Sequence, residues 1–221
     1  EDNPFDAVKT NVLGTSNIIE ASIKENVSKF ILISTDKATL PSTTLGASKL
    51  LAERLTINAN SNINSQKTIF SIVRFGNVIG SRGSVYQIFL DQIRRNIPIT
   101  VTDSRMTRFI MSIQDAAKLI LKSTVISKGG EIFILKMPSV KIKDLAESMI
   151  EVCGAKQIKY KQKITVSKTR IHERFHEYLV TPNEINYCQD MGSFYKISKA
   201  KNKRKVSNDE FSSQTVGKIP K

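Results

Sequence analysis

Apolar residues recur along this chain with two different spacings, and these spacings predict its secondary structure. An interval of three or four residues between apolar positions predicts helices, and it is found at 8–24, 45–59, 85–95, 113–127 and 140–152. Short continuous or alternating apolar runs predict strands, and they are found at 29–34, 69–75, 97–102 and 131–135. Because helices and strands alternate, we expect an α/β fold with a mostly parallel sheet.

The second predicted helix, at 45–59, is amphipathic. The side chains expected to face the core are Leu50, Leu51, Leu55 and Ile57. Glu53 and Arg54 are expected on the solvent side. Beyond about residue 158 the pattern breaks into mixed, lysine-rich segments, and no internal repeat is found.

The chain is strongly basic. Its 221 residues include 34 lysines and arginines against 20 acidic residues, a net charge of +14. Six of the ten residues 196–205 are basic, and we interpret this end as a solvated tail. Nucleic-acid binding would rest on charge alone, because no zinc finger or aromatic-interleaved basic motif accompanies it. A surface that attracts anionic sugar nucleotides is a sufficient explanation, so we expect no nucleic-acid partner.

Cysteine usage and hydropathy exclude several further classes. Cys153 and Cys188 are too few for a disulfide framework, and no cysteine–histidine cluster has metal-ligand spacing, so no metal is expected. No apolar stretch approaches the ~18 residues of a membrane span. The acidic first residues do not form a signal peptide. We expect a cytoplasmic protein with reduced thiols.

The candidate chemistry follows the first predicted strand. The apolar run 29–33 leads into Ser34, Thr35, Asp36 and Lys37, which place hydroxyls, a carboxylate and an amine side by side. Lys49 follows on the next predicted helix. Thr35 and Asp36 alone would be read as a cap at the end of a strand, but together with the two lysines they indicate a catalytic site.

Six segments occur in the order typical of one family: 11–15, 34–37, Lys49, 74–78, 80–85 and 106–109. With them the chain resembles the UDP-N-acetylglucosamine 4,6-dehydratases, the polysaccharide-biosynthesis branch of the extended short-chain dehydrogenase/reductase family. The resemblance covers about residues 3–185 and weakens after about Tyr187.

The resemblance implies an NAD- or NADP-dependent lyase acting on a UDP-N-acetylglucosamine-type sugar nucleotide. In that reaction hydride leaves C4, water is eliminated across C5 and C6, and hydride returns to C6; some members also invert C5. Asp36 and Lys37 would serve as acid and base for the elimination, and Thr35 would bind the sugar hydroxyl being oxidised. Lys49 would hold the nicotinamide ribose.

The resemblance also implies two sets of binding residues. Those near the cofactor are Asn11, Ser34, Lys49, Phe75 and Gly76. Those near the UDP-sugar are Asn77, Arg82, Val101, Thr102, Arg108, Arg170 and Glu173. Residues 170–173 read Arg-Ile-His-Glu where the family has Arg-Pro-Gly-Glu, so the positions of Arg170 and Glu173 depart from the pattern.

One catalytic position also departs from the family. Related reductases carry a tyrosine four residues before the helix lysine, on the same helix face, and here that residue is Leu45. Leucine has no proton to exchange. Asp36, Lys37 or an ordered water is left as the base for oxidation at C4.

No glycine-rich phosphate-binding fingerprint precedes the catalytic strand. We therefore expect a chain truncated at its N-terminus, with little dehydratase activity alone. The parts expected are a Rossmann-like catalytic portion at 1–80, a UDP-sugar region with returning Rossmann elements at 81–195, and a basic tail at 196–221. The alternatives are a UDP-sugar 4-epimerase and a non-catalytic remnant that binds UDP-sugar or a partner chain. Family relatives commonly form homo-oligomers.

Overall fold

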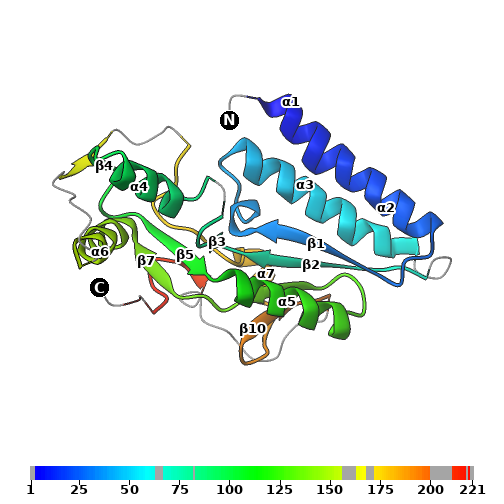
Figure 1. The fold of residues 1–221 in the computed structure, drawn as a ribbon. Coiled ribbons are helices and arrows are strands. Elements are labelled where there is room, and N and C mark those ends of the chain that lie inside the picture. The colour runs from blue at the N-terminus through cyan, green and yellow to red at the C-terminus, as the bar shows by residue number, and fades with distance from the viewer. Residues whose placement is uncertain are drawn as a thin grey trace. The chain divides into compact units, whose positions relative to one another are not determined.

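The computed structural model describes residues 3–62, 67–81, 83–155, 163–167, 172–199, 211–217 and 219. The chain forms two compact units, each assembled from separated stretches of sequence (Figure 1). The described residues within 1–76, 114–136 and 178–211 form unit 1, and those within 77–113, 137–177 and 212–221 form unit 2. The boundaries at residues 80 and 195 stay a prediction.

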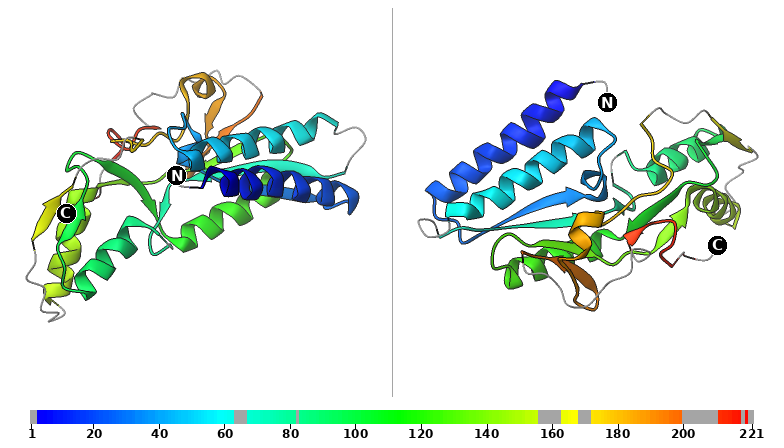
Figure 2. Two further views of the ribbon diagram at one scale, coloured as in Figure 1. Left: turned by 90° about the horizontal axis from the view of Figure 1, so that it is seen from above. Right: turned by 180° about the vertical axis from the view of Figure 1, so that it is seen from behind.

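A continuous helical segment opens unit 1. It consists of α1 (Pro4–Ala7), the π-helical stretch η1 (Val8–Leu13) and α2 (Gly14–Lys24) (Figure 2). The Asn3 side chain caps the first turn by accepting a hydrogen bond from the Asp6 backbone N–H at 3.3 Å. The predicted helix at 8–24 is confirmed, and its first part is widened into a π-helix. Such widening frequently occurs at functional sites.

Unit 1 is built on a five-stranded sheet in the order β1-β2-β6-β10-β9. Its strands are β1 (Lys29–Thr35), β2 (Ile69–Phe75), β6 (Ile132–Leu135), β9 (Cys188–Asp190) and β10 (Phe194–Ile197). The first three are parallel, and β10 and β9 add as antiparallel strands. The α/β class with parallel strands is confirmed. The hairpin β9–β10 was not predicted, because three or four residues carry too little periodicity to be recognised.

Two helices pack on opposite faces of this sheet, α3 (Thr44–Ala59) and α5 (Ile113–Ile126). Val73 of β2 packs with Leu119 of α5 in a buried cluster. The next residue, Arg74, instead bonds to Glu53 of α3. Successive strand residues point to opposite faces, so β2 contributes one side chain to each layer. Both predicted helices are confirmed.

The buried face of α3 differs from the expectation. Its fully buried residues are Gly46, Ser48, Ala52, Glu53 and Thr56, whereas Leu51 is 51% exposed. The prediction is wrong for Glu53, expected in solvent, and for Leu51, expected in the core, whereas Arg54 is exposed as predicted and Leu50, Leu55 and Ile57 are half-buried. Small residues let the helix approach the sheet closely, and burial of the Glu53 charge is tolerated because Arg74 pairs with it.

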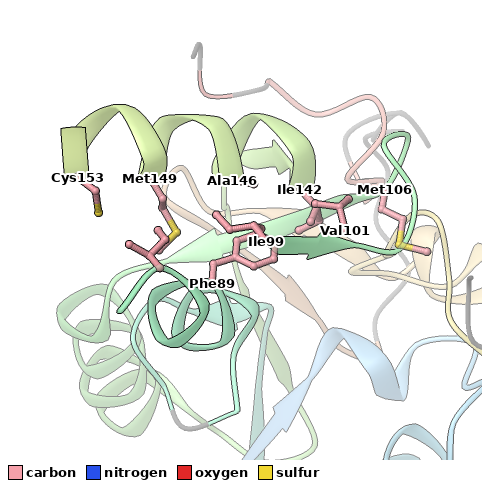
Figure 3. Close-up of a cluster of buried hydrophobic side chains, with 9 residues drawn as sticks. Phe89, Ile99, Val101, Met106, Ile142, Ala146, Met149 and Cys153 are labelled. Atoms are coloured by element: carbon pink, nitrogen blue, oxygen red, sulfur yellow. The ribbon is translucent and has the colours of Figure 1, made fainter. Parts of the chain in front are cut away.

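Unit 2 contains three short strands in the order β3-β5-β7, a parallel pair β4–β8 and two helices. Their bounds are β3 (Asn77–Val78), α4 (Val85–Arg94), β4 (Ile99–Val101), β5 (Thr107–Met111), β7 (Ser139–Lys141), α6 (Ile142–Ala155) and β8 (Ile164–Val166). Figure 3 shows the core of this unit, in which Phe89 of α4 and Ile99 of β4 meet Met149 of α6. The helix predicted at 140–152 begins at Ile142, after the unpredicted strand β7.

Among the described residues, no helix has both the length and the apolar character that a membrane crossing requires.

Gly80 and Gly83, which follow β3, have φ angles of 79° and 74°, a backbone conformation that residues other than glycine rarely adopt. Gly80 and Gly83 are therefore required by the turns they make.

Candidate active site

The carboxyl end of β1 carries the predicted catalytic residues on a tight turn, η2 (Asp36–Ala38). The Thr35 hydroxyl donates to Asp36 Oδ1 at 2.9 Å, and Lys37 Nζ donates to the same oxygen at 3.1 Å. The Asp36 side chain is fully buried, whereas that of Lys37 is 33% exposed. The structure therefore brings together a hydroxyl, a carboxylate and an amine, as the sequence predicts.

One oxygen of Asp36 differs from its neighbour. Asp36 Oδ2 is buried and has no hydrogen-bond partner among the described residues. A buried carboxylate oxygen without a donor is unfavourable unless it carries a proton or meets a ligand. Asp36 Oδ2 is therefore the oxygen of this side chain that is left for a proton or a ligand.

Lys49 extends from α3 to the same strand end. Its Nζ donates to the backbone carbonyl of Ile33 at 3.1 Å. Burial lowers the pKa of Lys49, and the negative charge of Glu53 opposes part of that shift. An ammonium group has three donors, so the bond to Ile33 leaves donors for a ligand.

The cofactor-side residues predicted in unit 1 lie around this strand end. Asn11, in the π-helical stretch η1, donates through Nδ2 to Ser48 Oγ on α3 at 3.0 Å. Phe75 is the register partner of Thr35 in the neighbouring strand, and Gly76 follows it. Ser34 is fully buried and donates to Glu53 Oε1 at 2.6 Å. Leu45 is 45% exposed.

Sequence reasoning missed a buried ionic network beside this site. Arg74 Nη2 donates to Glu53 Oε2 at 2.7 Å and Arg74 Nε donates to Glu53 Oε1 at 3.1 Å. Arg74 also donates to both oxygens of Glu184 at 3.1 Å and to the carbonyl of Leu179 at 3.0 Å. Glu184 belongs to the short helix α7 (Pro182–Ile185). An arginine inside an apolar strand was the one sequence signal for this network.

These charges hold one another in their ionised forms. Burial alone would lower the pKa of Arg74, but the charges and hydrogen bonds of Glu53 and Glu184 raise it above its usual value. Burial would raise the pKa of Glu184, but Arg74 and the Thr181 N–H lower it below its usual value. Arg74 and Glu184 are therefore both charged at neutral pH.

In unit 2 a second arginine meets two carboxylates. Arg108 Nη2 lies 3.6 Å from Glu173 Oε1, and Arg108 Nε lies 3.4 Å from Glu177 Oε1. Thr102 Oγ1 donates to Glu173 Oε1 at 3.4 Å, and Asn77 Nδ2 donates to Glu177 Oε2 at 3.4 Å. Four predicted substrate-side residues are thus linked through this cluster, and Glu177 is an addition that the sequence did not suggest.

Of the remaining predicted residues, one is described by the structure and two are not. The Val101 side chain is buried in the core of unit 2 (Figure 3). Arg82 and Arg170 lie outside the described residues.

Glu173 Oε2 is buried and lacks a hydrogen-bond partner within the described part of the chain. In that same part, no group of three or more His, Cys, Asp or Glu side chains could hold a metal ion.

A family model described as polysaccharide biosynthesis protein matches residues 1–199 of this chain. The chain belongs to the polysaccharide biosynthesis protein family. The chain is 51% identical over 200 residues to an uncharacterized membrane protein of Methanocaldococcus jannaschii. It is 43% identical to the capsular polysaccharide biosynthesis protein CapD of Staphylococcus aureus and 37% identical to a UDP-glucose 4-epimerase of Rickettsia canadensis.

The alignments cover most of this chain but a smaller part of each relative. The alignments include 88–89% of this chain but only 60%, 32% and 55% of the three relatives in turn, so the chain spans less than two thirds of their length. Among solved structures, Pen from Bacillus thuringiensis matches with a TM-score of 0.92 and 39% identity, covering 100% of this chain and 67% of Pen.

More distant structures show the fold alone. The NAD-dependent NDP-hexosamine 5,6-dehydratase TunA matches with a TM-score of 0.64 and 18% identity, over 79% of this chain and 61% of TunA. The fold is therefore the Rossmann-like fold of the extended short-chain dehydrogenases/reductases.

Proposed function

We propose that this protein acts as a nicotinamide-dependent UDP-N-acetylglucosamine 4,6-dehydratase in the synthesis of surface-polysaccharide sugars. The turn formed by Thr35, Asp36 and Lys37 carries the proposal. Elimination of water across C5 and C6 requires a base for the C5 proton and an acid for the departing hydroxyl. Among the described residues of unit 1, this turn places a carboxylate and an amine in direct contact beside an exposed strand end.

In the Asp36–Lys37 pair, the position of one proton decides whether the two side chains can act as the acid and the base of the elimination. The two side chains share a hydrogen bond of 3.1 Å between Lys37 Nζ and Asp36 Oδ1. Transfer of that proton from the ammonium to the carboxylate produces a carboxylic acid and a neutral amine together, with no change in the number of bound protons. A desolvated site favours the neutral form of the pair over the charged form.

Thr35 binds the sugar hydroxyl in this proposal. Its Oγ1 donates to Asp36 Oδ1 at 2.9 Å, so its lone pairs are left to accept the hydrogen of a substrate hydroxyl. In the neutral pair Asp36 already holds the proton from Lys37, Lys37 is reserved for the C5 proton, and Leu45 has no exchangeable proton. The proton that leaves the C4 hydroxyl therefore passes to an ordered water, the remaining candidate base.

The described residues of unit 1 fit part of a nicotinamide nucleotide. Lys49 Nζ lies at the carboxyl end of β1 with donors to spare for the hydroxyls of a ribose. Asn11, Ser34, Phe75 and Gly76 surround that strand end and would complete the site. When bound, the nicotinamide supplies reversible hydride transfer.

In unit 2, Arg108 would bind a UDP phosphate, with Asn77, Thr102 and Glu173 around it. Its contacts with Glu173 and Glu177, at 3.6 and 3.4 Å, are longer than the 2.7–2.9 Å or so of strong charge-assisted hydrogen bonds. Arg108 Nη1 is bonded to the backbone carbonyls of Thr107 at 2.8 Å and Phe175 at 3.2 Å, so Nε and Nη2, on the side of the two carboxylates, would be the donors for phosphate oxygens. Arg82 and Arg170 stay in the proposal on the family pattern alone.

A UDP-sugar 4-epimerase is the second candidate, and the Rickettsia canadensis relative with that name favours it. Both enzymes would oxidise C4, but only the dehydratase needs a base at C5. Lys37 therefore distinguishes the two reactions. Epimerisation assigns no proton transfer to its amine.

The test uses the protein purified from its own cells, with UDP-N-acetylglucosamine and NAD or NADP in deuterated water. The proposal expects a product lighter by one water, with deuterium at C5, and loss of product in Lys37→Gln. A product of unchanged mass without deuterium at C5 would establish the epimerase instead. Binding of UDP-sugar without turnover would overturn both enzyme proposals and leave the non-catalytic role.

A further inference from the structure

Three residues on one face of α3 converge on the carboxyl end of β1. Gly46, Lys49 and Glu53 are spaced by three and four residues, which places them on a single helix stripe. Gly46 and Glu53 are fully buried, and Lys49 lies between them. The stripe therefore runs from the catalytic turn into the core of unit 1.

Each residue of the stripe contacts a different part of the strand end. Glu53 Oε1 accepts the Ser34 hydroxyl at 2.6 Å, and Lys49 Nζ donates to the carbonyl of Ile33. A Cβ atom added to Gly46 would lie 2.3 Å from the carbonyl oxygen of Lys37, so the helix backbone rests directly on the catalytic turn. Three successive turns of α3 thus fix the residues on both sides of Thr35 and Asp36.

Glu53 is in turn fixed by Arg74. Arg74 binds both oxygens of Glu53, and its side chain is only 1% exposed. The network of Arg74, Glu53 and Glu184 holds one positive and two negative charges, a net charge of −1. A buried excess charge is costly unless a further partner compensates it. Lys49, one helical turn from Glu53, is placed to be that partner.

The other charged residues near α3 were considered as competing partners of Lys49. The elements packed against α3 carry Asp6, Lys9, Glu20, Lys24, Lys29, Asp36, Lys37 and Arg74, and α3 itself carries Arg54. Of these groups and Glu53, the charge of Glu53 is the one that raises the pKa of Lys49 against the effect of burial.

We propose that Glu53 is a positioning residue of the active site: anchored by Arg74, it holds the end of β1 against α3 and sets its negative charge one helical turn from Lys49. This inference rests on the proposed function for the role of Lys49 at the cofactor. Glu53 itself reaches no ligand, since it is fully buried and bonded through both oxygens to Ser34 and Arg74.

The first experiment compares Glu53→Gln with Glu184→Gln. Each variant removes one carboxylate from Arg74 and keeps the shape of the side chain, so each weakens the same network. Only Glu53 acts on Lys49. Lysines are labelled with carbon-13 by reductive methylation, the Lys49 signal is assigned with Lys49→Arg, and its pKa is measured by NMR titration. We expect a lower Lys49 pKa in Glu53→Gln and an unchanged one in Glu184→Gln.

An unchanged Lys49 pKa in Glu53→Gln, or an equal shift in both variants, would overturn the electrostatic part of the proposal. This readout needs no turnover, so it decides the inference even if the proposed reaction is not observed. Should Glu53→Gln fail to fold, Glu53→Asp is used instead. The aspartate keeps the charge but is too short to reach both Ser34 and Arg74, and we expect it to shift the Lys49 titration less than any neutral replacement.

The second experiment separates positioning from stability. The proposed reaction requires a cationic Lys49. The alkaline limb of the pH–rate profile should therefore lie at lower pH in Glu53→Gln than in the wild type. Its kcat should fall on the order of 100-fold, the cost of about 1 Å of misplacement. A variant that merely loses stability would keep the wild-type pH profile and kcat per folded molecule, and that result would refute the positioning role.

Discussion

Two arginines, one in each unit, are each paired with two glutamates, yet their surroundings differ. Arg74 in unit 1 bonds Glu53 and Glu184 at 2.7–3.1 Å and is 1% exposed. Arg108 in unit 2 lies 3.4–3.6 Å from Glu173 and Glu177 and is 13% exposed. We call the first set closed and the second open, because a buried oxygen of the second, Glu173 Oε2, has no partner among the described residues, although Arg108 Nη1 is itself bonded to the carbonyls of Thr107 and Phe175. We propose that equal charges serve structure in unit 1 and ligand binding in unit 2.

Removal of the closed arginine should have the largest effect. In Arg74→Met the buried carboxylates of Glu53 and Glu184 lose their partner, and we expect a loss of about 3–5 kcal/mol in the free energy of unfolding. Urea denaturation measures it. Neutralising both carboxylates in the same background should restore part of the loss. If Arg74→Met were as stable as the wild type, the distinction between the closed and the open set would be wrong.

Gly46→Ala tests whether the closed set controls the catalytic turn. The added methyl group must displace the backbone at Lys37, and we expect turnover to fall on the order of 100-fold with about 1–3 kcal/mol of destabilisation. Gly14→Ala in α2 is the matched control, because its Cβ would meet its nearest atom, the Lys9 carbonyl oxygen, at an ordinary 3.5 Å. Equal activity in the two variants would contradict the proposed support of the turn.

Arg108→Gln tests the open set. If Arg108 binds a UDP phosphate, the affinity for UDP measured by calorimetry should fall by about tenfold or more, since a hydrogen bond to a charged group contributes about 1.5–3 kcal/mol. Arg105→Gln is the matched control. Arg105 lies three residues before Arg108, is largely exposed and pairs with Asp103, so removing its charge should leave UDP binding nearly unchanged. Equal losses in both variants would show that only overall charge matters.

Acid should weaken the closed set in a defined direction. The pKa of Glu184 is lowered in the folded protein, so its contribution is complete above the ordinary glutamate pKa of about 4.3. As the pH falls below that value the unfolded chain binds the proton first, and the contribution disappears once the pH passes the lowered folded pKa. Urea midpoints should therefore fall more steeply with acid in the wild type than in Glu184→Gln. Parallel curves would contradict this assignment.

The sequence allowed the parallel strands and most helices to be predicted, because each has a local apolar period. It also placed Thr35, Asp36 and Lys37 together, since neighbours at a strand end stay neighbours in the fold. The orientation of α3 was predicted wrongly because its buried face consists of small and charged residues rather than leucines. Leu51 faces solvent, and Glu53 lies in the core.

The closed set could not be predicted from local patterns. Glu53 and Arg74 are 21 residues apart, and Arg74 and Glu184 are 110 residues apart. Nothing in the spacing of either glutamate shows that a buried guanidinium will compensate its charge. The sequence feature that indicates buried partners is Arg74 within the apolar strand 69–75, because a charged side chain is rarely buried without a partner.

The late position of β10 in the chain has a consequence for biosynthesis. β10 pairs with β6, although about 60 residues separate the two strands in order of translation. Until Phe194 to Ile197 leave the ribosome, the free edge of β6 is open to pairing with other nascent strands. Chaperone demand should therefore end only when the last strands of unit 1 have been synthesised.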